Sequence, residues 1–180
     1  MADEIATNFL SSMKSKGRKA MDWFKSIARK AQRAVVPGRT GRREIMDDRN
    51  TGITSSISIG RMYLFQYDAK WKEKLPYWDM FPLILPFDLA KGGFYGINFH
   101  YLQPGARVNF LRQLSRFASD KNYDKKTRYN IGELSGRYYK KTIKHYLYSQ
   151  VRSSFLNITA DEMAIAIFLP VARFKKGKPY

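Results

Sequence analysis

Apolar side chains recur at helical spacing through the first 37 residues. They run from Ile5 through Phe24 to Ala34, mostly in steps of three or four, which places them on one face of a helix. Lysines and arginines fill much of the remaining surface, so the pattern predicts a basic amphipathic helical arm. Gly17 falls inside the pattern and costs about 1 kcal/mol relative to Ala in a helix interior, so two shorter helices are an alternative to one long helix.

Turn-forming residues end the helical pattern. Pro37 and Gly38 stop it, and residues 38–56, rich in Gly, Thr, Ser, Arg and Asp, predict a linker. The periodicity then changes to two over residues 57–67, which predicts a β-strand.

Two further apolar segments predict strands. Residues 80–87 contain Pro82 and Pro86, which place the segment at a sheet edge or a strand end because proline lacks the N–H that a central strand donates. Residues 94–99 follow a glycine turn, and Gly96 within them indicates a bulge or a barrel corner. Short strands, tight turns and many aromatic residues predict a small curved antiparallel sheet or an SH3-like barrel.

The second half of the chain predicts three helices. The first begins after Pro104 and carries apolar side chains at Val108, Leu111, Leu114 and Phe117. The second is predicted from Ile143 to Phe155, because apolar residues follow one another there at intervals of four. The third is short: Thr159 and Glu162 fit a capping box, and Pro170 ends the helix.

The predicted fold class is therefore α+β, a small curved antiparallel sheet or SH3-like barrel with several helices and a basic N-terminal helical arm. The predicted segments are the arm at 1–37, a linker at 38–56, an α+β core domain at 57–174 and a basic tail at 175–180. Apolar residues make up 44% of the 180 residues, enough to bury a core.

Charge adds more to this picture than any other property. The formal net charge is +18, and a compact molecule that carries it calls for a polyanionic partner. Residues 1–43 hold eleven Lys and Arg against three acids, and residues 107–152 hold twelve against three, whereas residues 44–106 are nearly neutral. The positive charge therefore lies in two segments around a neutral, aromatic centre.

The composition also excludes several classes of protein. The chain has no cysteine, which excludes disulfides and thiolate metal sites. No stretch of 18 or more uncharged apolar residues occurs, so no membrane span is predicted. Asp3 and Glu4 precede a weakly apolar stretch, which is the wrong order for a signal peptide. We expect a soluble protein, intracellular or packaged from inside a cell.

The two basic segments supply the candidate nucleic-acid-binding residues. Lysine and arginine neutralise phosphates, and interleaved tyrosines can hydrogen-bond a phosphate or stack on an exposed base. The spacing of the arginines after Pro104 predicts that they share one helical face. The candidates in the second segment are Arg107, Arg112, Arg116, Lys125, Lys126, Arg128, Arg137, Lys140, Lys141 and Lys144. Those in the arm are Lys19, Arg29 and Arg33.

Catalytic and metal-binding patterns are missing from the sequence. The only histidines are His100 and His145, and there is no phosphate-binding loop, dinucleotide fingerprint or nucleophile elbow. His100, among aromatic residues, is expected to be a satisfied core or turn histidine. Asp68, Asp79 and Asp88 leave a magnesium-dependent nuclease as a minor alternative. We expect no enzyme activity, no cofactor and no small-molecule substrate.

Several segments of the neutral centre are similar to one known family. The chain resembles the DNA end protector proteins of T-even-like myoviruses and their relatives over about residues 60–174. The segments that carry the resemblance are 62–68, 75–79, 81–86, 93–102, 148–155 and 169–170. The resemblance implies a protein that binds the ends of packaged linear double-stranded DNA and shields them from host exonuclease. It also implies a location in the virion, with host cytoplasm during assembly, and other virion proteins as further partners.

Two functions from different classes therefore compete. The first is a virion protein that binds DNA ends or DNA backbone. The second is a small structural protein of the phage head, neck or tail, whose basic arm and tyrosine-rich surface pack against acidic neighbours.

Overall fold

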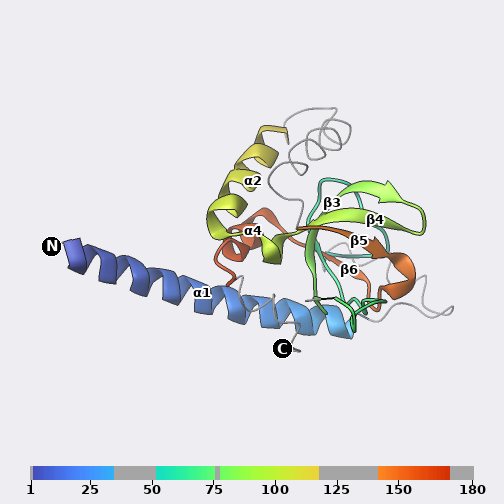
Figure 1. The fold of residues 1–180 in the computed structure, drawn as a ribbon, viewed down its shortest axis with the longest axis horizontal. Coiled ribbons are helices and arrows are strands. Elements are labelled where there is room, and N and C mark those ends of the chain that lie inside the picture. The colour runs from blue at the N-terminus through green and yellow to red at the C-terminus, as the bar shows by residue number, and fades with distance from the viewer. Residues whose placement is uncertain (1, 35–51, 76–77, 118–141, 171–180) are drawn as a thin grey trace.

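The computed structural model of the chain describes residues 2–34, 52–75, 78–117 and 142–170 (Figure 1). Most of the predicted linker, much of the second basic segment and the tail lie outside these residues. Among the helices that are described, none is both long and apolar enough to cross a membrane.

One continuous helix, α1 (Ala2–Arg33), forms where the sequence left open one helix or two. Its first half extends beyond the rest of the molecule, and its second half lies against the body (Figure 1). Gly17 lies where α1 passes the chain near Phe168, whose carbonyl oxygen would be 3.6 Å from an added Cβ. Ala20, Phe24 and Ala31 are fully buried, so burial of this stripe holds the helix in place.

A six-stranded antiparallel, open curved sheet forms the centre, which confirms the predicted α+β class. Its strands, in chain order, are β1 (Ile53–Thr54), β2 (Tyr63–Leu64), β3 (Leu83–Ala90), β4 (Gly93–Asn98), β5 (Ile143–Leu147) and β6 (Phe155–Asn157). Their order across the sheet is β1-β6-β2-β3-β4-β5. The described 3₁₀ turns and the remaining helices are η1 (Phe99–Tyr101), α2 (Pro104–Phe117), η3 (Tyr148–Gln150) and α4 (Ala160–Ala166).

Strand β3, which contains Pro86 and follows Pro82, lies inside the sheet and not at its edge. β3 pairs with β2 on one side and β4 on the other. However, β2 pairs only with Leu83 and Ile84, so Pro86 stands beyond the end of β2. The register with β4 shifts between Pro86 and Asp88, and a proline without an N–H is tolerated at such a bulge.

The prediction of a helix from Ile143 to Phe155 was wrong. β5, η3 and the start of β6 occupy this segment. A spacing of four also keeps side chains on one face of a strand, because the strand period is two, so the apolar pattern did not distinguish the two structures. The contacts of Tyr146 stabilise the strand: the residue is 4% exposed and packs against Phe94 of the paired strand β4.

The other helix predictions had mixed outcomes. The capping box before α4 is confirmed, with the Thr159 hydroxyl accepting from the Glu162 N–H and the Glu162 carboxylate accepting from the Thr159 N–H. In α2 the predicted core-facing Val108 is 37% exposed, whereas Phe110 is buried.

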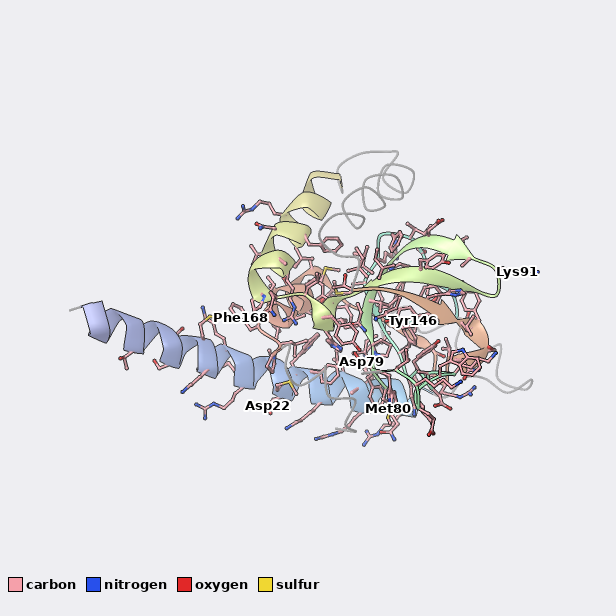
Figure 2. All side chains as sticks on the ribbon, in the orientation of Figure 1. Asp22, Asp79, Met80, Lys91, Tyr146 and Phe168 are labelled. Carbon is pink, nitrogen blue, oxygen red and sulfur yellow. The ribbon has the colours of Figure 1, made fainter. Side chains whose placement is uncertain are left out.

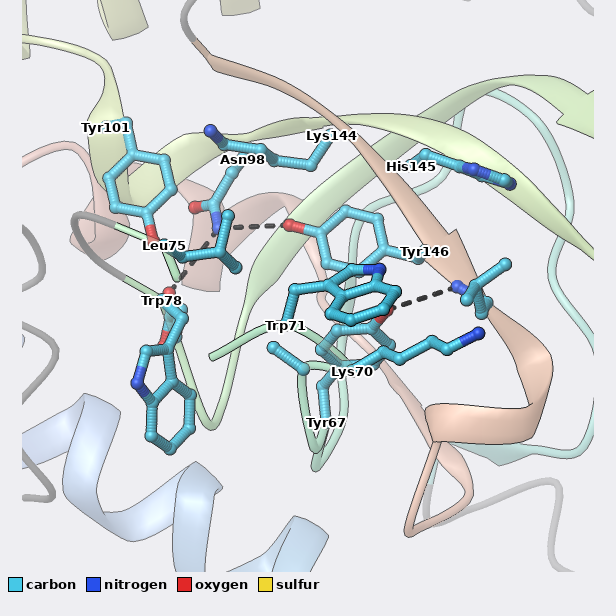
Figure 3. Close-up of a pocket in the computed structure, with 13 residues that line it drawn as sticks. Tyr67, Lys70, Trp71, Leu75, Trp78, Asn98, Tyr101, Lys144, His145 and Tyr146 are labelled. Carbon is cyan, nitrogen blue, oxygen red and sulfur yellow. Dashed lines mark hydrogen bonds between the residues drawn. The ribbon is translucent and has the colours of Figure 1, made fainter. Parts of the chain in front are cut away.

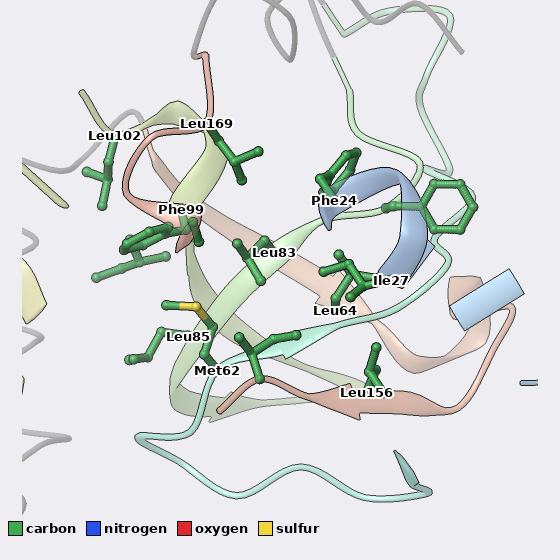
Figure 4. Close-up of a cluster of buried hydrophobic side chains, with 14 of the residues drawn as sticks. Phe24, Ile27, Met62, Leu64, Leu83, Leu85, Phe99, Leu102, Leu156 and Leu169 are labelled. Atoms are coloured by element: carbon green, nitrogen blue, oxygen red, sulfur yellow. The ribbon is translucent and has the colours of Figure 1, made fainter. Parts of the chain in front are cut away.

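Two clusters of buried apolar side chains form the core. The larger joins the second half of α1, α2 and α4 to the sheet through residues such as Phe24, Leu85 and Phe110 (Figure 4). The smaller is almost entirely aromatic and centres on Phe65, which contacts four other rings edge to face: Tyr67, Phe94, Tyr146 and Phe155. The sheet is therefore apolar on both sides, and β3 is buried from Leu83 to Phe87.

The buried side chain of Arg107, on α2, links α2 to α4 and to the turn η1 at the end of β4. Its side chain is 0% exposed and donates five hydrogen bonds to carbonyl oxygens. Nε and Nη2 bond Phe99 and His100 of η1, at 2.9 and 3.1 Å. Nη1 bonds the last turn of α4 and its continuation, at Ala166, Ile167 and Leu169. Burial lowers the pKa of Arg107 to about 10, so the guanidinium remains charged at neutral pH.

We predict that Arg107→Ala lowers the free energy of unfolding by about 3–5 kcal/mol, because it leaves several buried carbonyl groups unpaired and opens a cavity. Urea unfolding followed by circular dichroism measures the change. Asn109→Ala, at an exposed position of the same helix, should change the unfolding free energy by no more than about 0.5 kcal/mol. Equal effects of the two substitutions would contradict the role given to Arg107.

Candidate nucleic-acid interface

The side of α1 that faces away from the core is strongly basic. Ala20, Phe24, Ile27 and Ala31 occupy the buried side, which turns the cationic positions outward (Figure 2). Eight lysines and arginines on α1 are exposed: Lys14, Lys16, Arg18, Lys19, Lys25, Arg29, Lys30 and Arg33. They span about 28 Å at 1.5 Å per residue. We call this set the α1 basic face, and it includes all three arm candidates, Lys19, Arg29 and Arg33.

The arginines of α2 do not share one face. Arg107 is buried and its donors are occupied by carbonyl groups, so it stabilises the fold and is removed from the interface. Arg112 is exposed, because five residues rotate a helix by about 140° beyond a full turn and place it away from Arg107. The side chain of Arg116 lies outside the described part.

Six candidates of the second basic segment lie outside the described residues: Lys125, Lys126, Arg128, Arg137, Lys140 and Lys141. The remaining one, Lys144, is on β5 and is half-buried. Burial lowers the pKa of its ammonium group, and Nζ lies 5.6 Å from the centre of the Tyr101 ring.

Lys144 lines a pocket of about 340 Å³ between β5, the end of β4 and the segment that follows Tyr67 (Figure 3). We call it the aromatic pocket, because five of its side chains are aromatic: Tyr67, Trp71, Trp78, Tyr101 and Tyr146. Its walls thus offer flat π surfaces, and its lysines, Lys70 and Lys144, offer positive charge.

Trp71 is the most exposed of these rings, at 57%. Lys70 and Lys74 place their Nζ atoms 5.3 and 5.2 Å from the Trp71 ring centre, within cation–π range. Trp71 is not among the candidates predicted from the sequence, which all come from the two basic segments. A tryptophan among three lysines, Lys-Trp-Lys-Glu-Lys, was the available indication.

Two tyrosine hydroxyl groups of the pocket accept hydrogen bonds from the protein. Tyr67 accepts from the Leu147 N–H at 3.2 Å, and Tyr146 accepts from the Asn98 side chain at 3.1 Å. Burial raises the pKa of both phenols, so both keep their protons at neutral pH. Neither proton is donated to a residue within the described part of the chain.

Beneath the pocket lies a buried polar group formed by Asp79, Asn98 and His100. Asp79 Oδ2 accepts from the Asn98 side chain at 3.5 Å and is hydrogen-bonded to His100 Nδ1. His100 is 0% exposed, and Phe24 of α1 meets it edge to face at 4.9 Å. His100 is therefore a core histidine, as predicted. Burial lowers its pKa, in opposition to the charge of Asp79.

The three aspartates considered for magnesium do not lie together. Asp68 bonds Lys72 at 3.0 Å, Asp79 is in the buried polar group and Asp88 caps the backbone of Leu89. In the described residues, no group of three or more His, Asp or Glu is placed to hold a metal ion.

Comparison with models of protein families gives a match to nearly the whole chain. The model of the family described as Phage T4 terminal DNA protecting protein matches residues 3–180. No curated protein and no solved structure gives a significant match.

The lowered pKa of His100 predicts a pH-dependent stability. An unfolded histidine takes up a proton near pH 6.5, which the buried His100 resists, so its contribution is complete above that pH and is lost as the pH falls below it. We expect the free energy of unfolding to decrease below pH 6.5, by up to about 1.4 kcal/mol per pH unit for one proton.

Urea unfolding between pH 7.5 and about pH 5 measures this slope. His100→Asn, which keeps a donor toward Asp79, should reduce the slope, whereas His145→Asn, at the exposed histidine, should not. An unchanged slope in the His100 variant would assign the pH dependence to other groups.

Proposed function

The chain belongs to the family of the Phage T4 terminal DNA protecting protein, and from this membership we propose that it binds the ends of linear double-stranded phage DNA through its basic and aromatic side chains and shields them from exonuclease. The observation that carries the proposal is the α1 basic face, a set of eight exposed cations on one continuous helix. The family acts on the terminal DNA of a phage, so its members work in the virion or the infected cell. We place this chain in the virion, and in host cytoplasm during assembly.

Electrostatics gives the α1 basic face its affinity for DNA. Duplex DNA carries about one negative charge per 1.7 Å of its axis, and the basic face offers a row of cations over about 28 Å. Among the described side chains of α1, Asp22 is the one acid. Each phosphate contact releases condensed counterions, so binding should weaken steeply with salt.

Protection requires more than affinity for backbone, because an exonuclease begins at the terminal phosphodiester bond. A protein that covers the last base pair prevents this access without any chemistry of its own. The exposed aromatic side chains supply a surface of the kind that stacks on a base. We propose a binding role and no catalysis. Other virion proteins are further proposed partners, through the same charged surfaces.

We predict that the protein binds a linear duplex more tightly than a covalently closed circle of the same sequence, and that bound linear DNA is degraded more slowly by an added exonuclease. With about six phosphate contacts, log Kd should change with log salt with a slope near 5 in magnitude. Competition gel shifts and digestion time courses give the two results. Equal affinity for the circle, or for an unrelated acidic polymer, would support the structural alternative.

We further predict that replacing Lys19, Arg29 and Arg33 by Gln lowers the magnitude of this salt slope by about 2.7, the loss of three phosphate contacts. Lys91→Gln, in the exposed β3–β4 turn, is the control and should leave the slope unchanged. Replacing Arg112 and Arg116 by Ala tests α2 separately and should also weaken binding. A folded α1 variant with the wild-type slope would remove α1 from the interface.

A further inference from the structure

We propose that the aromatic pocket is a nucleotide site, which takes one unstacked base from the end of a DNA strand. The inference rests on the proposed function for the source of the nucleotide, but the pocket's own residues argue for the chemistry of the ligand. Four properties of the pocket point to this class.

The first property is its size. A volume of about 340 Å³ lies at the lower end of the roughly 300–1,000 Å³ found for small-molecule sites. It suits a single nucleotide rather than a length of duplex, so a base must leave its stack to enter. Terminal bases leave most readily, because they have a neighbour on one side only.

The second property is the stacking surface. Trp71 and Trp78 line the pocket from one segment, and Tyr101 lines it from the turn after β4 (Figure 3). Trp71 exposes 57% of its surface and already carries two lysine ammonium groups near its ring. Sequence-tolerant recognition of single-stranded nucleic acid combines aromatic stacking surfaces with cations in this way.

The third property is an excess of hydrogen-bond donors over acceptors. Tyr67 and Tyr146 accept from the protein and have their hydroxyl protons left for a ligand, as far as the described residues show. Asn98 is 1% exposed and its amide group is engaged by Asp79, Tyr146 and the His100 N–H. A matching ligand therefore presents acceptors, as the carbonyl oxygens and ring nitrogens of bases do.

The fourth property is charge. Lys70 and Lys144 line the pocket, and their ammonium groups, which lie near the Trp71 and Tyr101 rings, give it a positive charge that attracts an anion such as a nucleotide phosphate. Asp79 is 5% exposed and its carboxylate oxygens accept from the Phe81 N–H, Asn98 and His100. A nucleotide therefore matches the whole lining, because its base stacks on the aromatic side chains and its phosphate is attracted by the two lysines.

The test compares three hairpin-closed duplexes that differ only at their one open end. The end is blunt, carries one unpaired thymidine, or carries the same overhang as an abasic site. We expect the full chain to bind the thymidine overhang about 5- to 150-fold more tightly than the abasic one, the range for stacking one base. Trp71→Ala should remove most of this preference, and Trp71→Phe should retain it.

Tyr95→Ala is the matched control. Tyr95 is also an exposed aromatic residue of the sheet, at 40%, but it does not line the pocket, and its loss should leave the preference intact. A wild-type protein without a preference for the base, or a folded Trp71→Ala variant that keeps it, would overturn the proposal.

A second measurement separates failure of the pocket from failure of the proposed function. If no duplex binds, DNA-end binding is excluded, and titration with thymidine 5′-monophosphate by tryptophan fluorescence still decides the pocket. Saturable quenching that Trp71→Ala abolishes supports a nucleotide site. No quenching, or saturable binding of an apolar dye that the nucleotide does not displace, overturns it.

Discussion

The structure depends on satisfying carbonyl groups that are buried where the helices meet the sheet. The last turn of α4 and the 3₁₀ turn η1 both direct carbonyl oxygens into this region, where the end of a helix leaves carbonyl groups without enough backbone N–H donors. Arg107 bonds five of them with one planar fork. These bonds come from three separate nitrogens of the guanidinium, whereas lysine has one nitrogen with three donors and could not replace all five.

This junction also fixes the floor of the aromatic pocket. η1 follows β4 directly, and Asn98, the last residue of β4, caps η1 and bonds Tyr146. His100 within η1 bonds Asp79 and packs against Phe24 of α1. One path of contacts therefore leads from the basic helix through Phe24, His100 and Asp79 to the pocket. The position of α1 and the shape of the pocket are set by the same buried groups.

Sequence patterns predicted those elements that local interactions decide. The capping box of α4 and the apolar stripe of α1 depend on neighbours a few residues apart, and both predictions match the structure. The helix predicted from Ile143 did not form, because apolar residues at intervals of four suit a strand as well as a helix. Pairing with β4 stabilises the strand. Gly93 makes this pairing possible, since a Cβ there would collide with the Tyr146 carbonyl oxygen.

The prediction that Arg107 binds nucleic acid was wrong for a related reason. Several carbonyl groups that its side chain bonds come from residues about 60 positions away. The aromatic pocket joins three distant segments and was likewise beyond a local pattern.

Under the proposed function, recognition of a DNA end requires two kinds of interaction, to which we assign two separate surfaces. Phosphates are the same along the whole duplex, so cations such as those of the α1 basic face supply affinity and its salt dependence but no preference for the end. What an end alone offers is an exposed base, whose recognition by stacking depends little on salt. A pocket that accepts one base would therefore add a selectivity for the end that phosphate contacts do not supply. On this proposal the neutral, aromatic centre of the sequence is as necessary to end binding as its two basic segments, because charge alone would distribute the protein along the entire genome.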